Sequence, residues 1–368
     1  MKQIKRGLTA TLLIIFILTA LPAGSAGAAF VGDIAITSQG ACILDFETGI
    51  QLYGYREDVL RVPASMTKML TVYLIYDAIK AGEIKFDTVA TISDSVSSFS
   101  YNREYSNVPL PKGLTVTIDS LLDVVIVNSA CAAATALGEA LCGSEEAFVG
   151  RMNDKVKKLG VDAVFYDAFG GSPDNMISPY GMAVLSRNLL IDHPEVLKKS
   201  QQKTVVFRGS TYKNTNPLLD QYDGVDGLKT GYTDPAMYCF TATAERDGRR
   251  LITVTMGSST GTARGTDSKA LLDYGFAVAD SVIAMHQGGG EETKGGEDRP
   301  GGGNDLPGGN ENGSAPRPPL NSEGFRYIII CFIEYLQAEP DRTADLRLLS
   351  SLTAVVLMQF RSVYAEEG

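Results

Sequence analysis

The chain has 368 residues, with 33 lysines and arginines against 43 aspartates and glutamates, and a formal net charge of −10 at pH 7. This acidic balance argues against nucleic-acid binding and against a polybasic membrane-binding surface. The five cysteines are scattered and odd in number, and no cysteine or histidine spacing indicates zinc. We therefore expect buried free thiols, no disulfide framework, and no metal or other cofactor.

The N-terminal segment 1–28 has the parts of a secretory signal peptide. Lys2 and Arg6 precede an apolar run from Leu8 to Leu21, and the small residues Ala26-Gly27-Ala28 follow. We expect cleavage after Ala28 and a secreted, extracytoplasmic protein.

The segments that follow predict a hairpin and a series of helices. Glu47-Thr48-Gly49 predicts the turn of an N-terminal β-hairpin. Met66–Ile79 is apolar on nearly every face, which is typical of a buried helix, and Gly82 supplies a stop. Further helices are predicted over 117–127, 131–142, 144–159, 178–190 and 266–277. Several of them begin at a serine or threonine cap, and one has Pro179 at its first position.

The last strands are predicted around a second hairpin. Alternating runs over 238–244 and 251–256 flank Asp247-Gly248, a strong hairpin signal. Lys229-Thr230-Gly231 comes shortly before the first run, so we expect it to belong to or lead into a strand of the same antiparallel sheet. There, Gly231 would let a substrate backbone approach closely, and the lysine and threonine can hold a carboxylate.

The C-terminal part differs in composition from the rest of the chain. Residues 287–319 are rich in glycine, proline and acidic residues and predict a flexible linker. In the tail, 320–368, two apolar pieces cover 327–336 and 352–360, each shorter than the roughly 20 residues that a membrane-spanning helix needs. A weak membrane-surface segment is one hypothesis for this tail, and a poorly ordered tail is the other.

The chemistry is indicated by Ser65-Met66-Thr67-Lys68. A serine hydroxyl needs a base within hydrogen-bond reach, and the two histidines lie at a predicted helix end and beside a glycine-rich tract, so a Ser-His-Asp triad is not expected. Lys68 lies three residues after Ser65, on the same face if a helix begins there. A lone match of this kind is usually a cap and a solvated lysine. At the start of a buried helix, however, a lysine is costly without a purpose. It acts as a base only when neutral, so we expect burial and Lys229 to lower its pKa.

Two further motifs follow in order, Ser129-Ala130-Cys131 and Lys229-Thr230-Gly231, as in the serine enzymes that react with penicillin. With the stretches 62–68, 212–219, 227–233 and 250–257, they make the chain resemble, over about residues 34 to 280, the serine-type D-alanyl-D-alanine carboxypeptidases. These are the low-molecular-weight penicillin-binding proteins of the peptidase S11 family. The resemblance assigns the carboxypeptidase domain to 29–286 and implies a β-lactamase/transpeptidase-like α/β (α+β) fold, in which helices flank an antiparallel sheet built from both chain ends.

The same resemblance implies an activity. The enzyme would remove the terminal D-alanine from peptidoglycan stem peptides ending in D-Ala-D-Ala, on the cell-wall side of the bacterial membrane, with β-lactams as covalent inhibitors. Ser65 would be the nucleophile that becomes acylated, Lys68 the base, and Ser129 the hydroxyl that relays a proton.

The same resemblance implies which residues bind the substrate. Lys229 would supply electrostatic stabilisation, and Thr230 the contact to the substrate carboxylate. The backbone N–H of Tyr232, after the triplet that ends at Gly231, would complete the oxyanion hole with that of the nucleophile. Arg264 would help to bind the anionic end of the substrate, with an ordinary surface or ion-paired arginine as the alternative.

Cys131 departs from the family pattern, which usually has asparagine at this position of Ser-x-Asn. An amide both donates and accepts, whereas a thiol does neither well. A catalytically impaired penicillin-binding or peptidoglycan-binding module is therefore the alternative function. The loop 164–171 lacks the Glu-x-x-Leu-Asn pattern of class A β-lactamases, so penicillin should form a long-lived adduct. Asp167 in that loop is expected to be a loop or capping residue rather than a substitute base.

Overall fold

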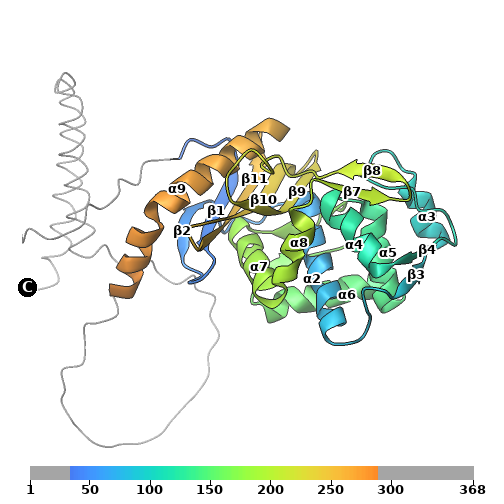
Figure 1. The fold of residues 1–368 in the computed structure, drawn as a ribbon. Coiled ribbons are helices and arrows are strands. Elements are labelled where there is room, and N and C mark those ends of the chain that lie inside the picture. Colours follow the sequence, from blue (N-terminus) through green and yellow to red (C-terminus); the bar gives the residue numbers. More distant parts are fainter. Residues whose placement is uncertain (1–33, 289–368) are drawn as a thin grey trace, which may run out of the picture. The chain divides into compact units, whose positions relative to one another are not determined.

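The five-stranded antiparallel sheet of this protein is built from both ends of the chain that the computed structural model describes, residues 34–288 (Figure 1). Its spatial order is β2 (Gln51–Tyr55), β1 (Gly40–Asp45), β11 (Arg249–Ser258), β10 (Met237–Arg246) and β9 (Val225–Thr233). The expected signal peptide, nearly all of the expected linker and the tail lie outside the described residues. The fold class predicted from the sequence is confirmed.

Both predicted hairpins are present. The turn after Asp45 joins β1 to β2, and Asp247-Gly248 joins β10 to β11 with φ angles of 50° and 77°. Two consecutive positive φ angles are what a tight two-residue hairpin needs, which explains the Asp-Gly pair. The Lys229 triplet lies within β9, at the edge of the sheet, as predicted.

The alternation of β1 separates two apolar layers. Ala41 and Ile43 pack with α9 (Gly261–Gly288), whereas Cys42 and Leu44 pack with the helices of the other face. The prediction of a helix over 266–277 was too short, because α9 begins at Gly261 and runs to Gly288. Glycines 261 and 265 lower helix propensity, but they pack closely against other segments, so tertiary contacts override the local signal.

The other face carries most of the helices (Figure 1). They are α2 (Lys68–Lys80), α3 (Asp94–Ser100), α4 (Ile118–Val127), α5 (Cys131–Cys142), α6 (Glu145–Lys158), α7 (Pro179–Asp192) and α8 (Leu197–Ser200), with 3-10 turns η1 (Ala64–Thr67) and η2 (Pro194–Val196). Thr117, Ser144 and Ser178 cap α4, α6 and α7 as predicted, each accepting a backbone N–H. No helix within residues 34–288 is both long enough and apolar enough to cross a bilayer.

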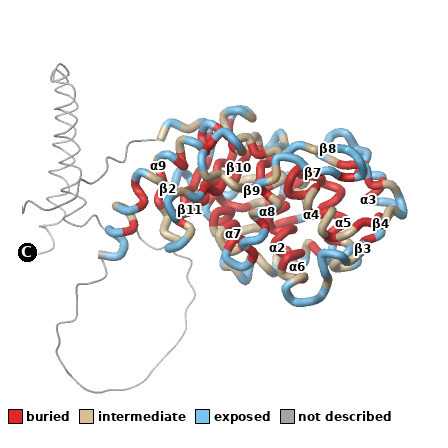
Figure 2. The backbone as a smooth tube through the Cα atoms, in the orientation of Figure 1, coloured by how far each residue is buried: buried red, intermediate tan, exposed pale blue. Residues whose placement is uncertain are grey.

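Helix α2 is buried on nearly all sides, as its apolar sequence predicts (Figure 2). Three short two-stranded sheets, none of them predicted, border the helical layer. They are β3 (Val89–Thr91) with β4 (Thr115–Thr117), β5 (Ala163–Val164) with β6 (Met176–Ile177), and β7 (Thr204–Phe207) with β8 (Ser210–Lys213). Helices α3 and α8 were not predicted either. All of these elements have seven residues or fewer, too short for a clear periodic pattern.

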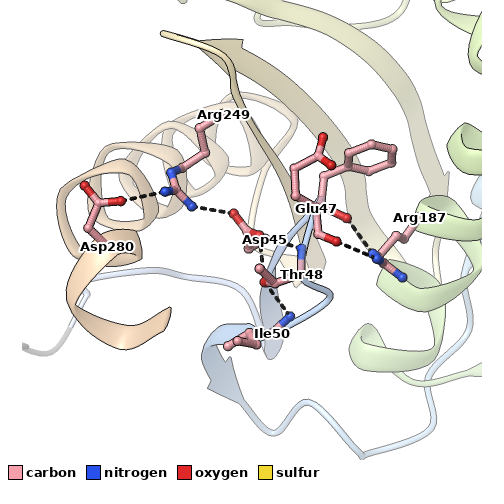
Figure 3. A network of polar contacts seen from close by, with 8 residues as sticks. Asp45, Glu47, Thr48, Ile50, Arg187, Arg249 and Asp280 are labelled. Atoms are coloured by element: carbon pink, nitrogen blue, oxygen red, sulfur yellow. Dashed lines mark hydrogen bonds and ion pairs between the residues drawn. The ribbon is translucent and has the colours of Figure 1, made fainter. Parts of the chain in front are cut away.

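A buried carboxylate ties the first hairpin to both layers (Figure 3). Asp45 accepts the backbone N–H and the hydroxyl of Thr48 at 2.9 and 2.7 Å and pairs with Arg249 at 2.8 Å. Arg249 also binds Asp280 of α9 at 2.5 Å, and Arg187 of α7 donates to two backbone carbonyls of the turn. The network therefore joins the hairpin turn, the sheet and one helix on each face.

Candidate active site

Ser65 lies in the 3-10 turn η1, directly before helix α2. The preceding residue, Ala64, has a φ of 49°, and its backbone is therefore in the left-handed region that costs a non-glycine residue about 1 kcal/mol or more. Lys68 is the first residue of α2 and is fully buried. Its Nζ lies 2.8 Å from the Ser65 hydroxyl oxygen, so the three-residue spacing brings the two groups into hydrogen-bond contact.

Lys68 has two further partners from distant parts of the chain. Its Nζ donates to the backbone carbonyl of Phe169 at 2.7 Å and to the sulfur of Cys131 at 3.2 Å. Within the described residues no carboxylate lies within ion-pair distance of this amine. The position of the amine is therefore set by one hydroxyl, one thiol and one peptide carbonyl.

The second motif lies between α4 and α5. Ser129 has a φ of 66°, again left-handed, and Cys131 begins α5, with its N–H bound to the carbonyl of Ser106 at 2.8 Å. Ser129 lines the same cleft as Ser65, but it is the sulfur of Cys131 that accepts the hydrogen bond which Lys68 donates to this motif. Left-handed backbone at two residues of one site is typical of functional regions.

The third motif supplies a second buried amine. Lys229 is 3% exposed, and its Nζ donates to the carbonyl of Thr230 at 2.9 Å. Burial lowers the pKa of Lys229 well below its usual value, and the neighbouring charge of Lys68 lowers it further. The hydroxyl of Thr230 lies 2.7 Å from that of Thr215, a cleft residue that the sequence reasoning missed. Its only signal was membership of the stretch 212–219 that carried the resemblance.

Gly231 packs closely against residues 63–65, the turn that carries the proposed nucleophile (the nucleophile turn). Our expectation that this glycine lets a substrate backbone approach closely stays a prediction, since Gly231 also lines the cleft. A Cβ atom there would lie 2.7 Å from the carbonyl oxygen of Pro63 and 3.1 Å from the backbone nitrogen of Ser65. The edge strand thus packs directly on the turn that holds the hydroxyl, and a side chain at this position would push the two apart.

An open cleft of about 590 Å³ is lined by residues of all three motifs, namely Ser65, Ser129, Cys131, Thr230 and Gly231, whereas the amines of Lys68 and Lys229 are buried. Arg264 of α9 lines the cleft and donates to the carbonyl of Gly231 at 3.1 Å, while its buried Nε has no partner in the described part of the chain. Tyr232 lies at the cleft, 49% exposed. The sequence reasoning did not identify Tyr105 or Phe169, which also line the cleft and have their rings 5.7 Å apart. Neither belongs to a motif, so no sequence signal indicated them.

Known proteins resemble this chain in sequence and in fold. The sequence pattern of the family described as D-alanyl-D-alanine carboxypeptidase, Peptidase_S11, matches residues 27–260. The chain belongs to this family. The carboxypeptidase DacF of Bacillus subtilis is 33% identical over 282 residues, which cover 74% of this chain and 71% of DacF. DacA of Escherichia coli is 33% identical over 258 residues, 69% of this chain and 64% of DacA.

A solved structure agrees with the sequence matches. Penicillin-binding protein D2 of Listeria monocytogenes, in its ampicillin-bound form, superposes with a TM-score of 0.59 at 30% identity, covering 67% of this chain and 99% of that one. The carboxypeptidase is thus a serine hydrolase with the penicillin-binding protein fold, as the motifs indicated. The alternative of an impaired binding module is not favoured, because the relatives matched over most of this chain are named as carboxypeptidases.

Proposed function

We propose that this carboxypeptidase releases the terminal D-alanine of peptidoglycan stem peptides through an acyl-enzyme on Ser65. The 2.8 Å contact between the hydroxyl of Ser65 and the amine of Lys68, at the base of an open cleft, carries the proposal. Ser65 is partly exposed and lines the cleft while the amine of Lys68 is buried, which suits a nucleophile that meets substrate and a base that does not.

The first half of the reaction acylates the enzyme. The neutral amine of Lys68 takes the Ser65 proton, and the oxygen attacks the carbonyl carbon of the penultimate D-alanine. The backbone N–H groups of Ser65 and Tyr232 stabilise the resulting oxyanion. As the tetrahedral intermediate collapses, the peptide bond breaks, and Ser129 relays the proton to the nitrogen of the leaving D-alanine.

The second half restores the enzyme. Water gives up a proton to the same relay and attacks the ester carbon, and the shortened peptide leaves as a carboxylic acid while Ser65 regains its proton. The terminal carboxylate of the substrate is held by the hydroxyl of Thr230 and the guanidinium of Arg264. Both side chains line the cleft, and the hydroxyl of Thr230 lies 2.7 Å from that of Thr215, which supports this placement.

The same attack on a β-lactam ring would give a covalent adduct. The Listeria relative has been solved with ampicillin bound and with cefotaxime bound, which supports β-lactam binding here. The adduct should be long-lived, because the loop 164–171 has no glutamate to activate a deacylating water.

The rest of the chain fits an exported enzyme. In this proposal segment 1–28 directs secretion, and residues 29–286 act on the cell wall. The tail, 320–368, is proposed to make at most a weak contact with the membrane surface.

The test uses the chain without its signal peptide, a fluorescent penicillin and the peptide diacetyl-Lys-D-Ala-D-Ala. Labelling together with D-alanine release supports the proposed reaction. Ser65→Ala should abolish both, whereas the matched Ser98→Ala, an exposed serine of α3, should change neither. Labelling without release would indicate an acyl-enzyme that turns over poorly. Neither labelling nor release by the native chain would leave only the binding module.

A further inference from the structure

The loop 167–172, which follows β5, lies directly against the nucleophile turn. Gly170, with a φ of 88°, packs so closely that a Cβ atom there would lie 1.9 Å from the carbonyl oxygen of Ala64. The carbonyl of Phe169 in the same loop accepts the hydrogen bond from Lys68 at 2.7 Å. The conformation of this loop therefore determines where the amine of the proposed base is held.

A single carboxylate organises the loop. Asp167, 9% exposed, accepts hydrogen bonds from consecutive backbone N–H groups and one amide. The donors are Phe169 at 2.9 Å and Gly170 on Oδ1, and Gly171 at 3.0 Å, Ser172 at 2.5 Å and the Asn175 side chain at 3.4 Å on Oδ2. Each donor faces a full negative charge, so these bonds are stronger than neutral ones.

One of these peptide groups joins the carboxylate to the base. The peptide between Phe169 and Gly170 donates its N–H to Asp167, and its C=O accepts a hydrogen bond from the Nζ of Lys68. The preceding peptide is used in the same way, since its N–H donates to Asp167 and its C=O accepts the hydroxyl of Thr71 at 2.5 Å. Hydrogen bonds in such a chain polarise one another, so the carboxylate makes the carbonyl oxygen of Phe169 more negative and a stronger acceptor.

We propose that Asp167 is a positioning residue for Lys68, holding and electrostatically biasing the amine through the Phe169–Gly170 peptide. The inference rests on the proposed role of Lys68 as the base. It goes beyond the expectation of a loop or capping residue, with which the hydrogen bonds that Asp167 accepts from backbone N–H groups agree. An asparagine could not substitute, because it offers one oxygen and one N–H₂ group to donors that surround both carboxylate oxygens.

The test is the rate at which the fluorescent penicillin acylates Asp167→Asn, measured from about pH 5 to about pH 10. We expect a roughly 10- to 100-fold lower rate, because the amine is less well placed. Because the variant removes a negative charge that acts on the amine, the acid limb of the pH–rate profile should also move to lower pH. A purely structural role would lower the rate without moving this limb.

Two matched variants isolate the effect. Asp174→Asn makes the same change at an exposed position beside the loop and should leave the profile unchanged. Glu145→Gln removes a carboxylate that accepts the N–H of Ala168 at 3.0 Å, in a peptide that does not bond to Lys68, so it should destabilise the loop with a smaller shift of the limb. If Asp167→Asn does not fold, Asp167→Glu and Asp167→Gln repeat the comparison, because glutamate and glutamine have the same length and differ in charge. The acid limb should then move only in the glutamine variant.

A failure of the proposed role of Asp167 can be distinguished from a failure of the proposed function. An acid limb that stays in place in folded, charge-removed variants would overturn the role of Asp167 while leaving the acyl-enzyme proposal intact. Labelling that persists in Ser65→Ala would instead overturn the proposed function itself.

Discussion

The sulfur of Cys131 lies 3.2 Å from the Nζ of Lys68, at the position where the family pattern usually has an asparagine amide. Sulfur is a weak acceptor, and a thiol has no N–H₂ group to offer a substrate carbonyl. Cys131 thus keeps an acceptor for the amine of Lys68, although a weaker one than an amide oxygen, and lacks the N–H₂ donor that an asparagine would offer to substrate.

Cys131→Asn should therefore speed the release of D-alanine, by about 10-fold, because one added charge-assisted or carbonyl hydrogen bond contributes about 1.5 kcal/mol. Kinetics with diacetyl-Lys-D-Ala-D-Ala measure the change. Cys131→Ser, which restores no amide, is the control and should give less than half of that gain. The same rate in Cys131→Asn and in the native enzyme would mean that the missing amide does not limit turnover.

Lys229 is expected to speed acylation and to lower the free energy of unfolding. Lys229→Met should lower the acylation rate by about 100-fold, because the electrostatic stabilisation proposed for this buried amine is removed. It should also raise the free energy of unfolding by about 1–2 kcal/mol at neutral pH, since an apolar side chain of similar length replaces a buried amine. Urea denaturation measures the second effect, and a less stable variant would contradict it.

The stability gain of Lys229→Met should depend on pH with a defined sign. The folded-state pKa of Lys229 lies below the unfolded value of about 10.5, so the unfolded chain binds the extra proton between these two values. The cost of the buried charge is complete below the folded pKa and disappears as the pH rises to the unfolded one. The difference between the two proteins should shrink toward pH 10.5, and a difference that grows would show the opposite linkage.

Gly231→Ala should impair acylation by forcing strand β9 away from the nucleophile turn. The added methyl group would lie 2.7 Å from a backbone oxygen, which cannot move as a flexible side chain would, and 3.1 Å from the N–H of Ser65. We expect a loss of about 10-fold or more in the rate of penicillin acylation. Gly150→Ala in α6, where nothing lies within 4 Å of the new methyl group, should acylate normally and gain about 0.5–1 kcal/mol in stability.

The Asp45 network should matter for stability and not for chemistry. The strand register places Asp45 opposite Leu251, at the other end of the sheet from Gly231. Asp45→Asn should lower the free energy of unfolding by about 2–3 kcal/mol, because it breaks a pair with Arg249 and leaves a buried donor unmatched. Exposed Glu47→Gln in the same turn should cost less than about 0.5 kcal/mol. Penicillin acylation of both folded variants should equal that of the native chain.

Features set by neighbouring residues could be predicted from the sequence. The caps at Thr117, Ser144 and Ser178, the Asp247-Gly248 turn, and the adjacency of Ser65 and Lys68 each depend on a few consecutive residues. Such local geometry follows from backbone hydrogen bonding within one turn. The fold class and the contact between Ser65 and Lys68 could therefore be predicted from the sequence.

Tertiary structure alone decided what surrounds the amine of Lys68. Lys68 is separated in the sequence from its partners Cys131 and Phe169 by 63 and 101 positions. Gly231 of strand β9 likewise packs against Pro63 in the turn that carries Ser65. No local preference encodes such pairs, because they form only when α2, α5, the loop 167–172 and β9 pack on one core. The sequence by itself indicated the proposed reacting groups, and long-range packing determined which atoms hold them in place.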